Sequence, residues 1–201
     1  MEKNKVVKNQ NDGGNSVTDI IYVMDRSGSM ANIMTDAIGG FNTFVKEQQK
    51  VEGDCYLTLI AFDTQYEVIY DRVPILEVKE LTSDRVFARG CTALLDTVGK
   101  ALSTMPDEWH VAAFIMTDGE ENSSIEWTNE KVKTLVQNKV DKGWDINFVG
   151  VGIDAFSMGG AMGLHASKIS NVSKNARGIM DYNALSSTIS TSYRTSGHKK
   201  N

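Results

Sequence analysis

Two kinds of hydrophobic pattern alternate along the chain. Short apolar runs rich in β-branched residues predict strands at about 17–24, 55–62, 65–70, 110–117, 144–151 and 168–172. Between them, apolar residues recur every three or four positions, which predicts amphipathic helices at about 30–45, 94–102, 129–140, 154–164 and 184–193. Strands and helices in this order predict an α/β three-layer sandwich, in which helices cover both faces of a mostly parallel, doubly wound, Rossmann-like sheet.

Turn residues and tails refine this prediction. Asp63 and Thr64 read as a two-residue connection between the second and third strands, which predicts a hairpin and therefore one antiparallel edge strand. Gly143 stands where a helix would end, and Gly159–Gly160 would break the helix at 154–164. Residues 1–16 and 196–201 are polar, so we expect flexible tails on either side of one domain at 17–195.

Composition excludes several classes of partner. The chain has 21 basic and 26 acidic residues, a net charge of −5, so no basic face is expected to bind nucleic acid. No apolar run approaches the ~20 residues of a membrane span, and the N-terminus lacks the apolar core of a signal peptide. Cys55 and Cys91 lack zinc-site spacing; we expect free, buried thiols, with one disulfide as the alternative. The expected location is the cytoplasm.

Oxygen-bearing side chains follow the predicted strand ends. Asp25, Ser27 and Ser29 alternate in the turn after the first strand, Thr92 opens a helix, and Asp118 follows the apolar run at 110–117. Because parallel strands bind ligands at their carboxyl ends, these five side chains are expected to meet at one sheet edge. Two carboxylates and three hydroxyls suit Mg²⁺, with Mn²⁺ or Ca²⁺ as alternatives. Neutral hydroxyls leave the cation's charge incompletely balanced, which favours an anion from outside. The alternative for the turn alone is a helix cap.

Three segments, at 25–30, 90–96 and 116–122, together resemble von Willebrand factor type A (VWA) domains. That family's metal-ion-dependent adhesion site combines an Asp-x-Ser-x-Ser turn with a distant Thr and a distant Asp, and all five residues match here. The resemblance covers nearly the whole chain and is greatest to stand-alone bacterial or phage members. It implies the VWA fold and an intact adhesion site.

The resemblance also implies a role for each residue. Ser27 and Ser29 would coordinate the cation directly, and Thr92 directly or through water. Asp25 and Asp118 would hold coordinating waters and orient the serines. A Glu or Asp of a partner protein would complete the coordination. The chain departs from many relatives in having Cys91 where they have glycine.

Nearby acids and other functions give competing interpretations. Asp96 is expected to brace the helix start, Asp63 to support the site at most, and Glu120 and Glu121 to be solvated. A self-assembling scaffold subunit is the runner-up function. A phosphate-handling α/β hydrolase is disfavoured because the glycine-rich phosphate motifs are missing and Ser27 replaces the second Asp of a dehalogenase-like site. A serine hydrolase lacks its Gly-x-Ser-x-Gly elbow, so no enzyme is predicted.

Overall fold

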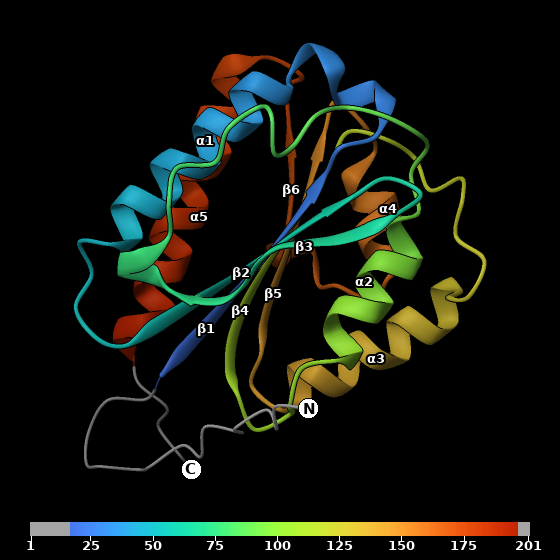
Figure 1. Ribbon diagram of the computed structural model, residues 1–201. Helices are drawn as coiled ribbons and strands as arrows, with labels where there is room; N and C mark the ends of the chain where they lie inside the picture. The colour runs from blue at the N-terminus through green and yellow to red at the C-terminus, as the bar shows by residue number, and fades with distance from the viewer. Residues whose placement is uncertain (1–16, 197–201) are drawn as a thin grey trace, which may run out of the picture.

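The computed structural model describes residues 17–196, which form a six-stranded sheet between two helical layers (Figure 1). The strands lie in the order β3-β2-β1-β4-β5-β6, and every neighbouring pair is parallel except β2 and β3. This arrangement confirms the predicted α/β sandwich with one antiparallel edge strand. The strands are β1 (Thr18–Asp25), β2 (Cys55–Phe62), β3 (Tyr66–Pro74), β4 (His110–Thr117), β5 (Asp145–Val151) and β6 (Ile169–Val172).

The helices divide between the two faces of the sheet (Figure 1). One face carries α1 (Met34–Gln48) and α5 (Ala176–Ser196), and the other carries α2 (Leu94–Ser103), α3 (Asn129–Asp141) and α4 (Ala155–Ala161). Three 3₁₀ turns complete the elements: η1 (Gly28–Asn32), η2 (Ile75–Glu77) and η3 (Ala166–Lys168). Within residues 17–196, no helix combines the length and apolar character needed to cross a membrane. The predicted tails at 1–16 and 197–201 lie outside the described residues, whereas residue 196 ends α5.

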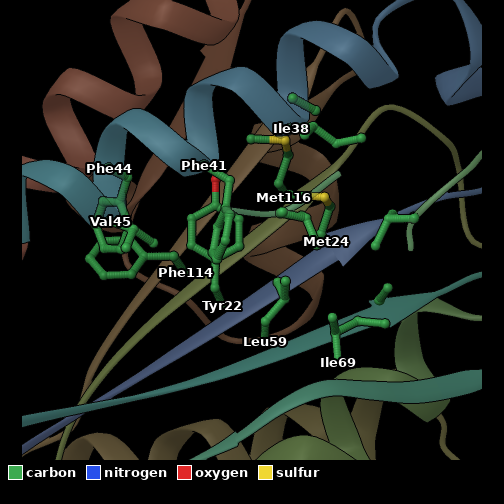
Figure 2. Packing of buried hydrophobic residues seen from close by; sticks show 14 of the residues in the cluster. Tyr22, Met24, Ile38, Phe41, Phe44, Val45, Leu59, Ile69, Phe114 and Met116 are labelled. Carbon is green, nitrogen blue, oxygen red and sulfur yellow. The ribbon is translucent and has the colours of Figure 1, made fainter. Parts of the chain in front are cut away.

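The central strand β1 is buried along its whole length. Its side chains alternate between the two faces, so that Tyr22 packs under α1 and α5 while Val23 packs under the opposite helices. The Tyr22 ring meets Phe41 edge-on with 5.1 Å between ring centroids, and Phe44 and Phe114 pack around it (Figure 2). This packing holds rigid the strand that ends at the candidate site.

Two predicted element boundaries are corrected at the edges of the site. The helix predicted from Met30 begins at Met34, because the preceding residues form the tighter turn η1. The third strand extends to Pro74, and the hairpin connection has three residues, Asp63 to Gln65. The reason for the longer connection is local, since the Gln65 backbone N–H donates to the Asp63 side chain at 2.7 Å.

Two helix predictions also need correction. The glycines at 159 and 160 lie inside α4, which continues through them to Ala161. The buried face of α5 is largely polar, with Asn183, Ser186, Ser190 and Arg194 inside, whereas Leu185 in the apolar pattern of the predicted helix at 184–193 is 44% exposed. The physical reason is that α5 packs on α1 partly through side-chain hydrogen bonds, which a search for apolar periodicity does not detect.

The strand order reverses at β1. The chain goes from β1 to β2 on one side, and β4 later pairs with the other side of β1. The carboxyl ends of β1 and β4 are therefore adjacent, with Met24 in register with Met116. Ligands of open parallel sheets bind at such a reversal. The loops carrying four of the five candidate residues, all but Thr92, leave the sheet at this point.

Candidate metal centre

The turn after β1 is organised by the buried carboxylate of Asp25. Its Oδ1 accepts the Ser27 backbone N–H at 2.6 Å, and its Oδ2 accepts the Thr117 hydroxyl at 2.5 Å. Burial raises the pKa of Asp25 to about 6 and the Asp118 charge adds to this, although hydrogen bonds from Thr117 and Ser27 act in the lowering direction. Asp25 therefore fixes the turn and joins it to the end of β4.

Three hydroxyl groups converge in front of this carboxylate. The Ser27 and Ser29 hydroxyl oxygens are 3.0 Å apart, and the Ser29 hydroxyl donates to Asp118 Oδ1 at 2.5 Å. A Cβ on Gly119 would lie 2.7 Å from Thr92 Oγ1, 3.2 Å from Ser29 Oγ and 3.6 Å from Ser27 Oγ. The three oxygens thus surround one point that the glycine keeps clear. Ser29 is exposed while Ser27 and Thr92 are buried, so the cluster opens to solvent on one side.

Thr92 is held in this cluster by two loops. Its backbone N–H donates to the Asn122 side chain at 3.0 Å, and its carbonyl accepts the Asn122 N–H at 3.1 Å. Just before it, the carbonyl of Gly90 accepts the N–H of Gly28 at 3.0 Å. Sequence reasoning missed Asn122 as a positioning residue. No local signal marks it, because its partner lies on another loop.

A buried guanidinium braces the turn from behind. Arg26 is 1% exposed, and it donates to Asp63 at 2.9 Å and to Glu67 at 2.5 Å, both on the β2–β3 hairpin. Arg89, from the segment leading to Thr92, donates to the same Asp63 oxygen at 2.7 Å. Burial alone would raise the pKa of Asp63, but hydrogen bonds from Arg89 and the charge of Arg26 more than offset it and lower that pKa. Asp63 supports the site, as expected; the two arginines were not foreseen.

The remaining acids near the site have structural partners. The carboxylate of Asp96 accepts three successive backbone N–H groups at 125–127. This confirms a structural role for Asp96, although the segment that it braces is the loop before α3 and not the start of its own helix. Glu121 accepts the N–H of Leu95 at 2.8 Å in the first turn of α2, so its prediction as a solvated acid is wrong. The free N–H groups of a helix start need acceptors, and here one comes from another loop. Glu120 is exposed.

The two cysteines differ in environment. Both thiols are free, Cys55 buried and Cys91 exposed. Burial raises the pKa of Cys55 to about 12, which makes its thiol unreactive near neutral pH. The prediction of a buried thiol is wrong for Cys91, which is exposed although the neighbouring Thr92 is buried.

The donor set fits a hard divalent cation. Within residues 17–196, no three His, Cys, Asp or Glu side chains are grouped to hold a metal, so hydroxyls must supply part of any site. Oxygen donors alone suit Mg²⁺ or Mn²⁺, whereas softer metals prefer thiolate or imidazole. Ser27, Ser29 and Thr92 provide three converging oxygens, with Asp25 and Asp118 beside them. The five predicted residues therefore meet at one place.

Comparisons with known proteins identify the fold. The sequence matches no protein-family model and no curated protein. Among solved structures, one similar to this chain is proximal thread matrix protein 1 from the mussel byssus, in a form described as having a zinc-occupied MIDAS motif. The two superpose with a TM-score of 0.66 at 15% identity, and the alignment covers 88% of this chain and 46% of that one. The von Willebrand factor type A protein of Catenulispora acidiphila gives 0.56 and 16%, covering 86% and 42%. The chain has the von Willebrand factor type A fold.

A third VWA structure shows the extent of the likeness. The vWF domain of the pilus tip protein Mfa5 from Porphyromonas gingivalis has a TM-score of 0.65 and 12% identity, and the alignment covers 88% of this chain and 96% of that domain. By contrast, this chain spans less than half the length of the mussel and Catenulispora proteins. The alignments therefore establish a complete VWA fold, and functions of those longer proteins are not transferred with it.

Proposed function

We propose that this chain is a non-enzymatic interaction module that binds an acidic side chain of a partner protein through a divalent cation, Mg²⁺ first. The observation that carries the proposal is the convergence of the Ser27, Ser29 and Thr92 hydroxyls around one point. These oxygens would hold the cation, while Asp25 and Asp118 orient them. A bound cation would supply the positive charge that attracts the partner's carboxylate. Because most of the converging donors are neutral, that charge stays available.

The surroundings of the serines support binding over hydrolysis. Ser27 and Ser29 contact each other and Asp118, and within residues 17–196 neither hydroxyl has a histidine as its hydrogen-bond partner. The serine that does contact a histidine is Ser167, which lies 2.9 Å from His165 Nδ1 in the exposed turn η3. That pair caps the turn locally. In the described part of the chain, neither Ser27 nor Ser29 therefore has the histidine base that activates the nucleophile of a serine hydrolase.

Similarity to VWA structures supports the same class of function. One is a pilus tip protein and another a byssus matrix protein with zinc at its adhesion site, as those structures are described. Our preference for Mg²⁺ in this chain rests on its oxygen-only donors. We also propose a cytoplasmic location, since an exposed free thiol such as Cys91 is kept reduced there.

Calorimetric titration with Mg²⁺ and Mn²⁺ tests the metal site. Wild type should bind both ions, and the double variant Ser27→Ala/Ser29→Ala should bind at least about a hundredfold more weakly because two donors are lost. Ser103→Ala is the matched control, since that serine is exposed at the end of α2. Equal heats in wild type and the double variant would disprove the metal site.

Affinity capture from the native host tests the partner. A protein captured in Mg²⁺ should be lost in chelator and lost with Asp118→Ala, which removes the carboxylate that orients Ser29. Asp141→Ala, at the exposed end of α3, should capture it normally. A partner indifferent to both changes would place the interface elsewhere. The mass of the purified chain with and without chelator separates this function from the runner-up, metal-dependent self-assembly.

A further inference from the structure

One ammonium group lies at the candidate metal centre. Lys174 Nζ is 2.6 Å from Asp118 Oδ2, and the Asp118 side chain has no exposed surface while that of Lys174 is 36% exposed. No hydrogen-bond donor elsewhere in residues 17–196 satisfies Oδ2. The charge of this buried carboxylate is therefore balanced by a lysine that follows β6, far along the chain.

The order of the strands and a glycine after β5 allow the Lys174 side chain to reach Asp118. Lys174 follows β6 and Asp118 follows β4, so the lysine must cross the end of β5, a span of about 10 Å at two strand spacings. Gly152, just after β5, has a φ of +69° and no side chain, and a Cβ there would come within 2.9 Å of Lys174 Cβ. The glycine leaves room for the lysine stem to pass.

The backbone next to Lys174, from which its side chain extends, is also fixed. Asn175, the next residue, accepts the Gly178 N–H through its side chain at 2.9 Å and the Ile179 N–H through its carbonyl at 3.2 Å. These bonds cap the beginning of α5. Lys174 therefore projects from a constrained turn, and its contact with Asp118 is a defined feature of the fold.

The ammonium and a divalent cation would compete for one carboxylate. Asp118 uses Oδ1 to accept the Ser29 hydroxyl, and its Oδ2 pairs with Lys174. A cation among the hydroxyls would lie within a few ångströms of Asp118 and so of the ammonium. Repulsion between like charges is strong at that separation away from bulk water. Both cations cannot be held there without a cost in binding free energy.

We propose that Lys174 is an internal competitor of the divalent cation, whose ammonium leaves Asp118 when the metal binds. This inference rests on the metal site of the proposed function. Its consequence is that the chain sets its own metal affinity: the lysine weakens binding and raises the metal concentration at which the site fills. The released ammonium would move toward solvent, to which the Lys174 side chain is already 36% exposed.

Calorimetry on the full chain tests the competition. Lys174→Met keeps the length of the stem without its charge, and it should bind Mg²⁺ and Mn²⁺ at least about tenfold more tightly than wild type. Lys174→Arg keeps the charge and should stay within about threefold of wild type. The matched control is Lys168→Met, which loses a similar ion pair, 2.7 Å to Asp145 with the lysine 41% exposed. Its metal affinity should not change.

Two further measurements detect the ion pair directly. In chelator, Lys174→Met should melt at a lower temperature than Lys168→Met, because it leaves the buried Asp118 charge unpaired. In wild type, acetylation of Lys174 followed by mass spectrometry should speed up on adding Mg²⁺, while acetylation of Lys168 should not. Equal melting temperatures, or a Lys174 labelling rate indifferent to Mg²⁺, would overturn the inference.

The metal affinities of wild type and Lys174→Met show whether this inference alone fails or whether the proposed function fails as well. If wild type binds the metal and Lys174→Met binds it equally or more weakly, the lysine is not a competitor, and the metal site itself stands. If neither wild type nor Lys174→Met binds Mg²⁺ or Mn²⁺, the metal site is wrong and the competition falls with it.

Discussion

At the scale of single residues, the site depends on Gly119, which has no side chain, as much as on the residues that supply oxygens. The three hydroxyl oxygens of the cluster lie around the place where a Cβ on Gly119 would be. Protein interiors tolerate extra volume poorly when the neighbours are fixed. Here Thr92 is fixed by Asn122, and Ser29 by Asp118. Neither hydroxyl has an easy way to move aside.

Gly119→Ala should therefore weaken both metal binding and the fold. We expect at least about a tenfold loss of Mg²⁺ affinity and a fall of roughly 1–3 kcal/mol in the free energy of unfolding. Gly160→Ala is the control, because a Cβ there meets nothing within 4 Å in α4. It should leave metal affinity unchanged and stabilise the chain by up to about 1 kcal/mol. Calorimetry and urea unfolding measure both, and an unaffected metal affinity in Gly119→Ala would refute this account.

The sequence predicts some site residues and misses others for a physical reason. Asp25, Ser27 and Ser29 are visible because alternate spacing in one turn is a local pattern. Arg26 and Asn122 are not, because their roles come from partners on other loops, at Asp63 and Thr92. Contacts between loops depend on how the sheet is assembled, and a single sequence does not display that.

At the scale of elements, α5 is attached to α1 by an arginine. Arg194 donates to the carbonyls of Gln48 at 2.7 Å, Val51 at 2.9 Å and Gly53 at 3.0 Å. The last carbonyls of a helix and those just beyond it lack intrahelical partners, and a cation is favourable there. One guanidinium thus satisfies the end of α1. The polar inner face of α5, which its apolar pattern did not predict, follows from this docking.

Arg194→Met should weaken the attachment of α5 to α1. We expect the free energy of unfolding to fall by about 2–4 kcal/mol, because the buried carbonyl of Gln48 and the less buried carbonyls of Val51 and Gly53 lose a charged donor. Arg177→Met provides the comparison, since that side chain is 91% exposed on the same helix and should change stability by less than about 0.5 kcal/mol. Urea unfolding followed by circular dichroism measures both. Matching midpoints for the two variants would show that the cap contributes little.

At the scale of the whole molecule, the architecture was predictable because it depends on hydrophobic pattern. Short apolar runs such as 110–117 became central strands, and the hairpin after Phe62 became the antiparallel edge. Two of the predictions that failed are the start of α1, where the tight turn η1 forms, and the break at Gly159–Gly160, where Gly159 packs closely against Ile169. Apolar burial therefore determines the layers, while polar contacts between loops determine the site.

The pairing of β1 with β4 has a consequence for how the protein folds. Asp25 and Thr117, which share a hydrogen bond at the site, are 92 residues apart in the chain. Parallel pairings of such high contact order form slowly, because loop-closure entropy is lost before the contacts compensate for it. No intermediate lacking the β1–β4 pairing can assemble the oxygen cluster. Metal affinity would then appear only after β1 and β4 have paired, and it would serve as a kinetic probe of that step.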